Sequence, residues 1–189
     1  MIESERVDGV VVLRMAAGEN VFDGPFVAAL TSALDDAAAT GGPLVLTGTA
    51  KFFCNGLDLG WLGGAAPEDA AAMFRGLHGV LARLLRFPGA TVAAINGHAF
   101  GAGAIMAAAA DFRVQRRDRG FLCLPEVDLG LAMSDEFDAV LRAKWPSHAV
   151  LRARLTGHRY GGPDALTAGL VDAVADEDDL QATAVALVA

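Results

Sequence analysis

The feature of the sequence that most restricts its fold is an uncharged stretch of 20 residues, Thr91 to Ala110. Its length matches the apolar core of a bilayer, so one interpretation is a membrane-spanning helix. However, Asn96 and His98 interrupt the stretch, five of its last eight residues are alanine, and Asp111 and Arg113 follow directly. Alanine drives membrane insertion only weakly. We therefore expect a buried strand, a turn and a buried helix, and no contact with membranes.

The composition predicts one folded domain covering residues 1–189. Hydrophobic residues make up 53% and charged residues 20% of the chain, which is ordinary for a globular protein. A formal net charge of -8 disfavours nucleic acid as a partner. The two cysteines, Cys54 and Cys123, and the acidic first residues disfavour secretion and a disulfide framework. Because the last residues are not a Ser-Lys-Leu peroxisomal signal, we expect a cytoplasmic location.

Short apolar runs alternate with segments of helical periodicity along the chain. Pro25 and Pro67 suit the first turns of two helices, and Ser134 suits the N-cap of a third. Residues 163–168 predict a short fourth helix. Strands interleaved with helices indicate a mixed α/β fold. The predicted strands are residues 10–13, 44–46, 92–95 and 121–124.

Several common catalytic motifs are absent. The sequence has no GxSxG serine elbow and no Walker loop, and residues 101–103 lack the third glycine of a dinucleotide-binding fingerprint. Its histidines stand singly, without the close spacing to Cys, Asp or Glu that metal sites usually show. We therefore expect no metal ion and no cofactor. We expect a structural or exposed role for each of the four histidines, His78, His98, His148 and His158.

Two segments combine an apolar run, glycines and the start of a helix. In residues 51–59, the pair Asn55-Gly56 permits a positive φ, and Asp58 can cap the helix that follows. In residues 95–104, glycines lead into an alanine-rich helix. Both turns can leave backbone N–H groups free, because the first N–H groups of a helix have no partner within it. Two such donors can converge on one anionic oxygen.

A third segment, residues 120–130, places Glu126 between Pro125 and Val127 after an apolar run. Burial raises the pKa of a carboxyl group and suits it to act as a base. Each of the three segments also has a plain structural interpretation, because glycine turns are common and a Pro-Glu pair often only begins a helix. Their joint order along the chain favours a shared function.

That order resembles the crotonase superfamily of acyl-CoA enzymes, which includes the enoyl-CoA hydratases, isomerases and their relatives. KFFCNGLDL is similar to the first oxyanion segment of the family, NGHAFGAG to the second, and PEVDLGL to the catalytic-glutamate segment. The resemblance runs from about Asn20 to Asp172. It implies an α/β spiral of β-β-α turns with stacked sheets, here with a shortened C-terminal helical region. It also implies a homotrimer or a dimer of trimers.

The resemblance further implies which residues act. The thioester carbonyl of an acyl-CoA substrate would lie between the backbone N–H groups of Leu57 and Ala102, and Glu126 would be the catalytic base. Alanine at position 102 departs from the glycine often found there. Coenzyme A would be part of the substrate, so no separate cofactor is expected. The implied substrate contacts are Lys51, Phe53, Asn55, Gly56 and Gly101. For Lys51 the alternative to a substrate contact is a solvated surface charge.

Within the superfamily, the residues favour isomerisation. Hydratases of the family use two glutamates, and the first falls on Ile105, which cannot move a proton. A lone base can still move a proton from the α- to the γ-carbon of a thioester. Residues 116–120 together with 125–131 look most like the 3-enoyl-CoA to 2-enoyl-CoA isomerases. The alternatives are another acyl-CoA enzyme, such as a decarboxylase, hydrolase or hydratase, and a non-catalytic acyl-CoA-binding relative.

Overall fold

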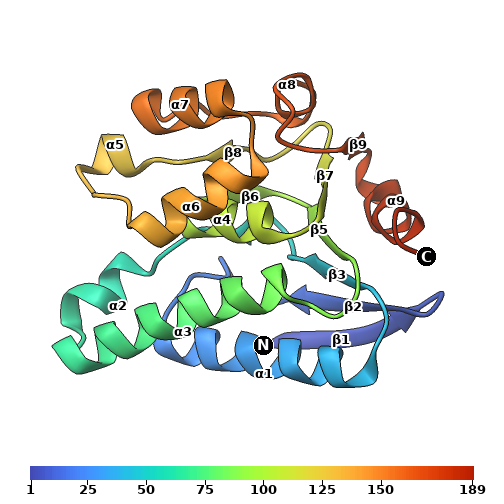
Figure 1. The fold of residues 1–189 in the computed structure, drawn as a ribbon, viewed down its shortest axis with the longest axis horizontal. Coiled ribbons are helices and arrows are strands. Elements are labelled where there is room, and N and C mark those ends of the chain that lie inside the picture. The colour runs from blue at the N-terminus through green and yellow to red at the C-terminus, as the bar shows by residue number, and fades with distance from the viewer.

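The computed structural model describes residues 1–189 and contains two β-sheets surrounded by helices (Figure 1). The larger sheet has six strands in the order β1-β2-β3-β5-β7-β9, and the smaller has three in the order β4-β6-β8. β1 and β2 pair antiparallel, and all other neighbours pair parallel. The strands are β1 (Ile2–Val7), β2 (Val10–Met15), β3 (Leu44–Thr47), β4 (Phe52–Cys54), β5 (Thr91–Ile95), β6 (His98–Phe100), β7 (Phe112–Arg116), β8 (Leu122–Cys123) and β9 (Ala173–Ala175).

A repeated β-β-α unit builds both sheets. β3, β5 and β7 lie in the larger sheet, and the strand that follows each of them, β4, β6 or β8, lies in the smaller one. A helix comes next in each repeat. Because the small-sheet strands are parallel, their carboxyl ends meet at one edge, where the three helices begin. These three helices are α2 (Leu59–Gly64), α4 (Ala102–Ala109) and α5 (Glu126–Leu129), and α3 (Pro67–Leu85) follows α2.

Helices α1 (Gly24–Thr40) and α3 lie side by side along one face of the larger sheet (Figure 1). Asp23 caps α1, since its Oδ1 accepts a 2.7 Å hydrogen bond from the Phe26 amide, and Pro25 lies in the first turn. One face of α1 packs against the core, because Phe26, Leu30, Leu34 and Ala37 are buried at helical spacing. The sequence correctly predicted both helices and their proline starts.

The uncharged stretch of residues 91–110 folds into β5, β6 and α4. All eight residues of α4 are buried, because alanine and glycine let this helix pack closely against the small sheet. A methyl group on Gly103 would lie only 2.3 Å from the carbonyl oxygen of Cys54. The predicted strand, turn and buried helix are thus confirmed. None of the helices combines the length and apolarity needed to cross a bilayer.

The C-terminal third adds four helices to this core: α6 (Asp135–Lys144), α7 (Ser147–Thr156), α8 (Gly162–Thr167) and α9 (Leu180–Ala186). Ser134 caps α6 as predicted, since its Oγ accepts a 3.3 Å hydrogen bond from the Phe137 amide. α9 covers the face of the larger sheet opposite to α1 and α3, with Leu180 and Val185 packed among the valines of β2, β5 and β7. The strand predicted at 121–124 is shorter, because only Leu122 and Cys123 pair with β6.

Candidate active site

The turn between β4 and α2 has the conformation that its sequence predicted. Gly56 has a φ of 86°, which side-chain-bearing residues rarely adopt. Asp58 caps α2, because its Oδ1 accepts a 2.9 Å hydrogen bond from the Trp61 amide. Between them, the Leu57 N–H donates to no acceptor in the protein. The turn therefore holds a free backbone donor in a fixed place.

A residue that the sequence argument did not single out, Asn20, holds this turn against the rest of the fold. Its buried side chain donates to the carbonyls of Met15 and Phe53, both at 3.1 Å. Next to it, the Phe22 amide donates to the Gly56 carbonyl at 2.8 Å. Asn20 has a φ of 54°, in the left-handed region that asparagine tolerates better than most residues. The residue type is therefore the one signal in the sequence that could have pointed to this turn.

The second turn, between β6 and α4, meets the first. Gly101 has a φ of 51°, and its amide donates to the Cys123 carbonyl at 2.9 Å. Ala102 is the first residue of α4, so its N–H group has no hydrogen-bond acceptor within the helix. A methyl group on Gly56 would lie 3.7 Å from the Ala102 nitrogen and 2.8 Å from the Phe100 oxygen. The two donor segments are therefore in direct contact.

Glu126 lies on the third turn, at the start of α5, and faces the second. Its Oε1 lies 3.1 Å from the place that a methyl group on Gly101 would occupy. Its Oε2 is buried and has no hydrogen-bond partner. Burial raises the pKa of Glu126, while its own backbone amide and the Arg154 guanidinium act in the opposite direction. A carboxyl group of this kind suits proton transfer to and from carbon.

These three turns enclose one end of a cavity of about 600 Å³. α2 and α3 form one side of it, and α5 and the start of α6 form the other. The walls away from Glu126 are mainly apolar, as in most small-molecule sites. The cavity brings together six of the residues named from the sequence: Asn55, Gly56, Leu57, Gly101, Ala102 and Glu126.

Two predicted substrate contacts lie elsewhere. Phe53 is fully buried in the hydrophobic core, because side chains of adjacent strand residues point to opposite faces, so its ring packs instead of lining the cavity. Lys51 is exposed, with its Nζ 5.1 Å from the centre of the Phe52 ring, and it lies outside the cavity. Conversely, His78 of α3 lines the cavity, which its isolated place in the sequence did not indicate.

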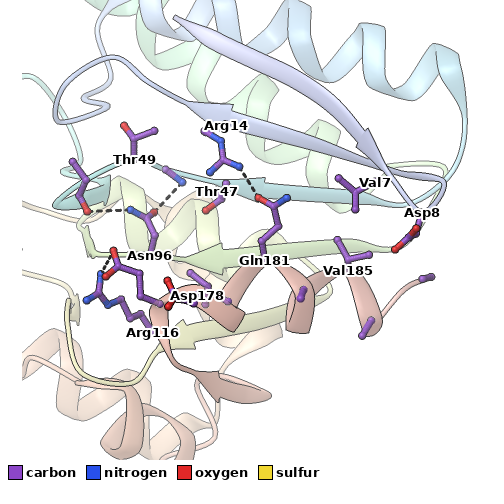
Figure 2. Close-up of a pocket in the computed structure, with 17 residues that line it drawn as sticks. Val7, Asp8, Arg14, Thr47, Thr49, Asn96, Arg116, Asp178, Gln181 and Val185 are labelled. Atoms are coloured by element: carbon purple, nitrogen blue, oxygen red, sulfur yellow. Dashed lines mark hydrogen bonds and ion pairs between the residues drawn. The ribbon is translucent and has the colours of Figure 1, made fainter.

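A larger cavity of about 820 Å³ lies beneath α9, at the carboxyl ends of β3, β5 and β7 (Figure 2). Its two arginines are paired with neighbouring side chains. Arg14 donates to Gln181 at 2.5 Å and to Glu5 at 3.2 Å. Arg116 forms ion pairs with Asp118 at 2.7 Å and with Glu177 at 2.5 Å. This cavity contains none of the residues named as catalytic from the sequence.

Comparisons with known proteins identify the family. The sequence profile of the family described as "Enoyl-CoA hydratase/isomerase" matches residues 5–189. The chain is 39% identical over 171 residues to "Enoyl-CoA delta isomerase 2, peroxisomal" of Arabidopsis thaliana, covering 86% of this chain and 71% of the relative. It is 37% identical over 166 residues to "Enoyl-CoA delta isomerase 3" of the same plant, covering 84% and 70%.

The solved structures agree with the same assignment. An enoyl-CoA hydratase from Mycobacterium ulcerans superposes with a TM-score of 0.90 at 28% identity, over 98% of this chain and 82% of the other. The predicted α/β spiral with stacked sheets is therefore confirmed. By its sequence profile, its relatives and its fold, the chain belongs to the enoyl-CoA hydratase/isomerase family of the crotonase superfamily.

Proposed function

We propose that the protein is an enoyl-CoA isomerase that moves a double bond from the 3 to the 2 position of an acyl-CoA thioester. The observation that carries this proposal is that the cavity contains a single carboxyl group, Glu126, beside the two contacting donor segments at Leu57 and Ala102. The relatives named as enoyl-CoA delta isomerases support the same reaction. Coenzyme A enters as part of the substrate, so the reaction needs no other cofactor.

The proposed reaction uses Glu126 twice. Its carboxylate removes a proton from C2 of a 3-enoyl-CoA, and the electron pair of that C–H bond moves toward the thioester carbonyl to give a dienolate. The amides of Leu57 and Ala102 donate to the dienolate oxygen. The protonated Glu126 then returns its proton to C4, and the double bond forms between C2 and C3. Backbone donors suit this step because they are already oriented before charge develops.

Hydration is the main alternative, and the cavity offers less support for it. Hydratases of this superfamily hold water between two glutamates. Position 105, where the first of these would lie, is an isoleucine that is fully buried in the core. The cavity therefore has one group that can exchange a proton with carbon near the two amides, which is enough for isomerisation.

We extend the proposal to assembly and location. Exposed leucines on α5 and α7, two helices in contact, support association into a homotrimer or a dimer of trimers; they are Leu129, Leu151 and Leu155, with 53%, 53% and 71% of their surface exposed. Light scattering on the purified protein tests this. A cytoplasmic location is the second extension, and fractionation that separates peroxisomes from cytosol is its direct test.

The function is tested by incubating the protein with 3-hexenoyl-CoA and separating the products by chromatography. We expect 2-hexenoyl-CoA as the product. Glu126→Gln should lower kcat by about 10²–10⁴-fold, the usual contribution of a positioned base, without lowering acyl-CoA affinity. Asp128→Asn is the matched control, because it makes the same change on α5 at an exposed residue outside the cavity.

The other outcomes contradict the proposal in distinct ways. Formation of 3-hydroxyhexanoyl-CoA from 2-hexenoyl-CoA as the main activity would indicate a hydratase. Release of free CoA would indicate a hydrolase, and release of carbon dioxide from a carboxyacyl-CoA would indicate a decarboxylase. Binding of acyl-CoA without any conversion would indicate a non-catalytic relative. Full activity of Glu126→Gln would remove Glu126 from the mechanism.

A further inference from the structure

The first backbone donor of the site is aimed by the carbonyl of its own peptide group. Because a trans peptide is planar, its C=O and N–H bonds point in opposite directions, so a hydrogen bond that fixes one also fixes the other. The Leu57 N–H shares its peptide group with the Gly56 carbonyl, which accepts a 2.8 Å hydrogen bond from the Phe22 amide. The direction of the free N–H therefore depends on what holds residues 55–58 against the segment before α1.

Gly56 leaves this turn easy to distort. With a φ of 86° and no side chain, it can rotate its two peptide groups at less cost than other residues can. Such a rotation would turn the Leu57 N–H away from the cavity, although the path of the chain would hardly change. The turn therefore needs bonds to residues outside it if its donor is to keep one direction.

The segment before α1 supplies these bonds on both sides of Gly56. After the glycine, the Asp58 amide donates to the Phe22 carbonyl at 3.1 Å. Before it, Asn55 is bound twice by Glu19, since its amide donates to the Glu19 carbonyl at 3.0 Å and its Nδ2 donates to Glu19 Oε2 at 2.6 Å. Hydrogen bonds to a carboxylate are about twice as strong as those between neutral groups. Glu19 is the one charged side chain that bonds to this turn from outside it.

The backbone at Glu19 is itself fixed by its neighbours. The Asn20 amide donates to the Ala17 carbonyl at 3.0 Å, and the Ala17 amide donates to Asn20 Oδ1 at 2.8 Å. The Asn20 side chain is fully buried and also donates to the Phe53 carbonyl at 3.1 Å. Exposed charged side chains often contribute little, because they lose entropy when they are held in one place. Here the Glu19 side chain starts from an anchored backbone and reaches a partner that is anchored to the same residue.

We propose that Glu19 is a positioning residue for the isomerisation, because its carboxylate holds Asn55 and so keeps the Leu57 N–H aimed at the thioester oxygen. Glu19 does not line the active-site cavity, although it lines an adjoining cleft of about 510 Å³. Its effect on the reacting atoms must therefore pass through Asn55. This inference rests on the proposed function and adds to it a residue that acts on the first donor.

The test measures the C=O stretching frequency of bound 2-hexenoyl-CoA, labelled with ¹³C at the carbonyl carbon, by infrared difference spectroscopy. Hydrogen bonds to a carbonyl oxygen lower this frequency, so the shift per bound ligand reports how well the donors are aimed. We expect Glu19→Ala to reduce the shift and to lower kcat for 3-hexenoyl-CoA by about tenfold, the value of one net hydrogen bond, with KM unchanged. Glu19→Gln should restore most of both, because the glutamine amide oxygen also accepts from Asn55 Nδ2.

Asp35→Ala is the matched control. Asp35 is an exposed carboxylate that also accepts a 2.7 Å hydrogen bond from a side chain, but this bond, from Arg83, joins α1 to α3. Its loss should leave the carbonyl shift and kcat at their wild-type values. A variant that is only destabilised keeps the wild-type shift per bound ligand, so an unchanged shift in Glu19→Ala would overturn the inference. A raised KM with unchanged kcat would overturn it too, since Glu19 would then be a substrate contact.

The same experiment keeps this inference apart from the proposed function. The carbonyl shift needs binding of 2-hexenoyl-CoA but no turnover. A wild-type protein that shifts the carbonyl without isomerising 3-hexenoyl-CoA would contradict the proposed reaction, and the shift in Glu19→Ala would still decide whether Glu19 aims the donor. A wild-type protein that binds 2-hexenoyl-CoA without any carbonyl shift would overturn the inference, because no donor would then reach the thioester oxygen.

Discussion

The cavity beside Glu126 and the cavity beneath α9 differ in how their polar groups are satisfied. The cavity beneath α9 is the larger, at about 820 Å³ against about 600 Å³, and it is lined by two arginines and three acidic residues. Yet its arginines are paired within hydrogen-bond distance. The smaller cavity holds two residues with an unpaired buried atom, Glu126 and His78.

This difference in pairing, and not size or polarity, supports placing the proposed reaction in the smaller cavity. Beneath α9, a hydrogen bond from Arg14 to Gln181 joins β2 to the C-terminal segment, and the ion pair of Arg116 with Glu177 joins β7 to it, so both serve the fold. In the active-site cavity, glycines bring backbone segments into contact, and the donors and the carboxyl are left free for a ligand. Changes in the cavity beside Glu126 should therefore alter activity, and changes in the cavity beneath α9 should alter stability.

Gly56→Ala should lower activity more than any other change in either cavity wall proposed below. A methyl group there would lie 2.8 Å from the Phe100 oxygen, so it should push the two donor segments apart. Loss of one oxyanion donor typically lowers kcat by about 10²–10³-fold, and we expect a loss of this size in the isomerase assay. Gly9→Ala is the matched control, because Gly9 has a φ of 84° against 86° but no atom within 4 Å. Equal losses in both variants would attribute the effect to backbone strain alone.

A second prediction concerns pH. The base must be ionised to act, and burial raises its pKa, so kcat/KM should fall with acidification at a pH above the usual range of a glutamate. Arg154 favours the ionised form of Glu126, so Arg154→Gln should move this inflection to higher pH. Arg142→Gln is the control, because Arg142 and Arg154 bind the same partner, Asp138, and only Arg154 acts on Glu126. Coincident pH profiles for the wild type and Arg154→Gln would contradict the prediction.

The sequence predicted those parts of the site that depend on local chemistry. Gly56 and Gly101 need a positive φ that few other residues adopt, and the cap at Asp58 needs a short side chain with an acceptor oxygen, so these features could be read without a fold. The cap at Ser134 follows the same logic. Glu126 could be named because apolar neighbours in the chain predicted its burial, and the structure places its Oε2 out of contact with solvent.

What the sequence did not predict depends on residues far apart in the chain. His78 and Asn20 act through contacts with segments tens of residues away, which no local pattern records. β1 lacks an apolar run because its four central residues are all exposed in this edge strand. Its signal was the pair Asp8-Gly9, whose positive φ values suit a tight hairpin turn. Phe53 was expected as a substrate contact from the motif, but its ring is buried in the core, because the strand pleat decides where the ring points.

The smallest expected effect tests the cavity beneath α9. The Arg116 side chain is buried, whereas its partners Asp118 and Glu177 are 64% and 66% exposed. Arg116→Met keeps much of the buried stem and leaves both carboxylates to water, so it should cost about 1 kcal/mol of stability. For a chain of this size that lowers Tm by about 2–4 °C, measurable by calorimetry. Arg117→Met is the control, because Arg117 is itself half-exposed and pairs with the exposed Asp176, so it should cost less. Both variants should retain full kcat/KM, since their ion pairs lie on the far side of the larger sheet from Glu126. A fall in kcat/KM for Arg116→Met, at a temperature where this variant is folded, would show that the cavity beneath α9 also contributes to activity.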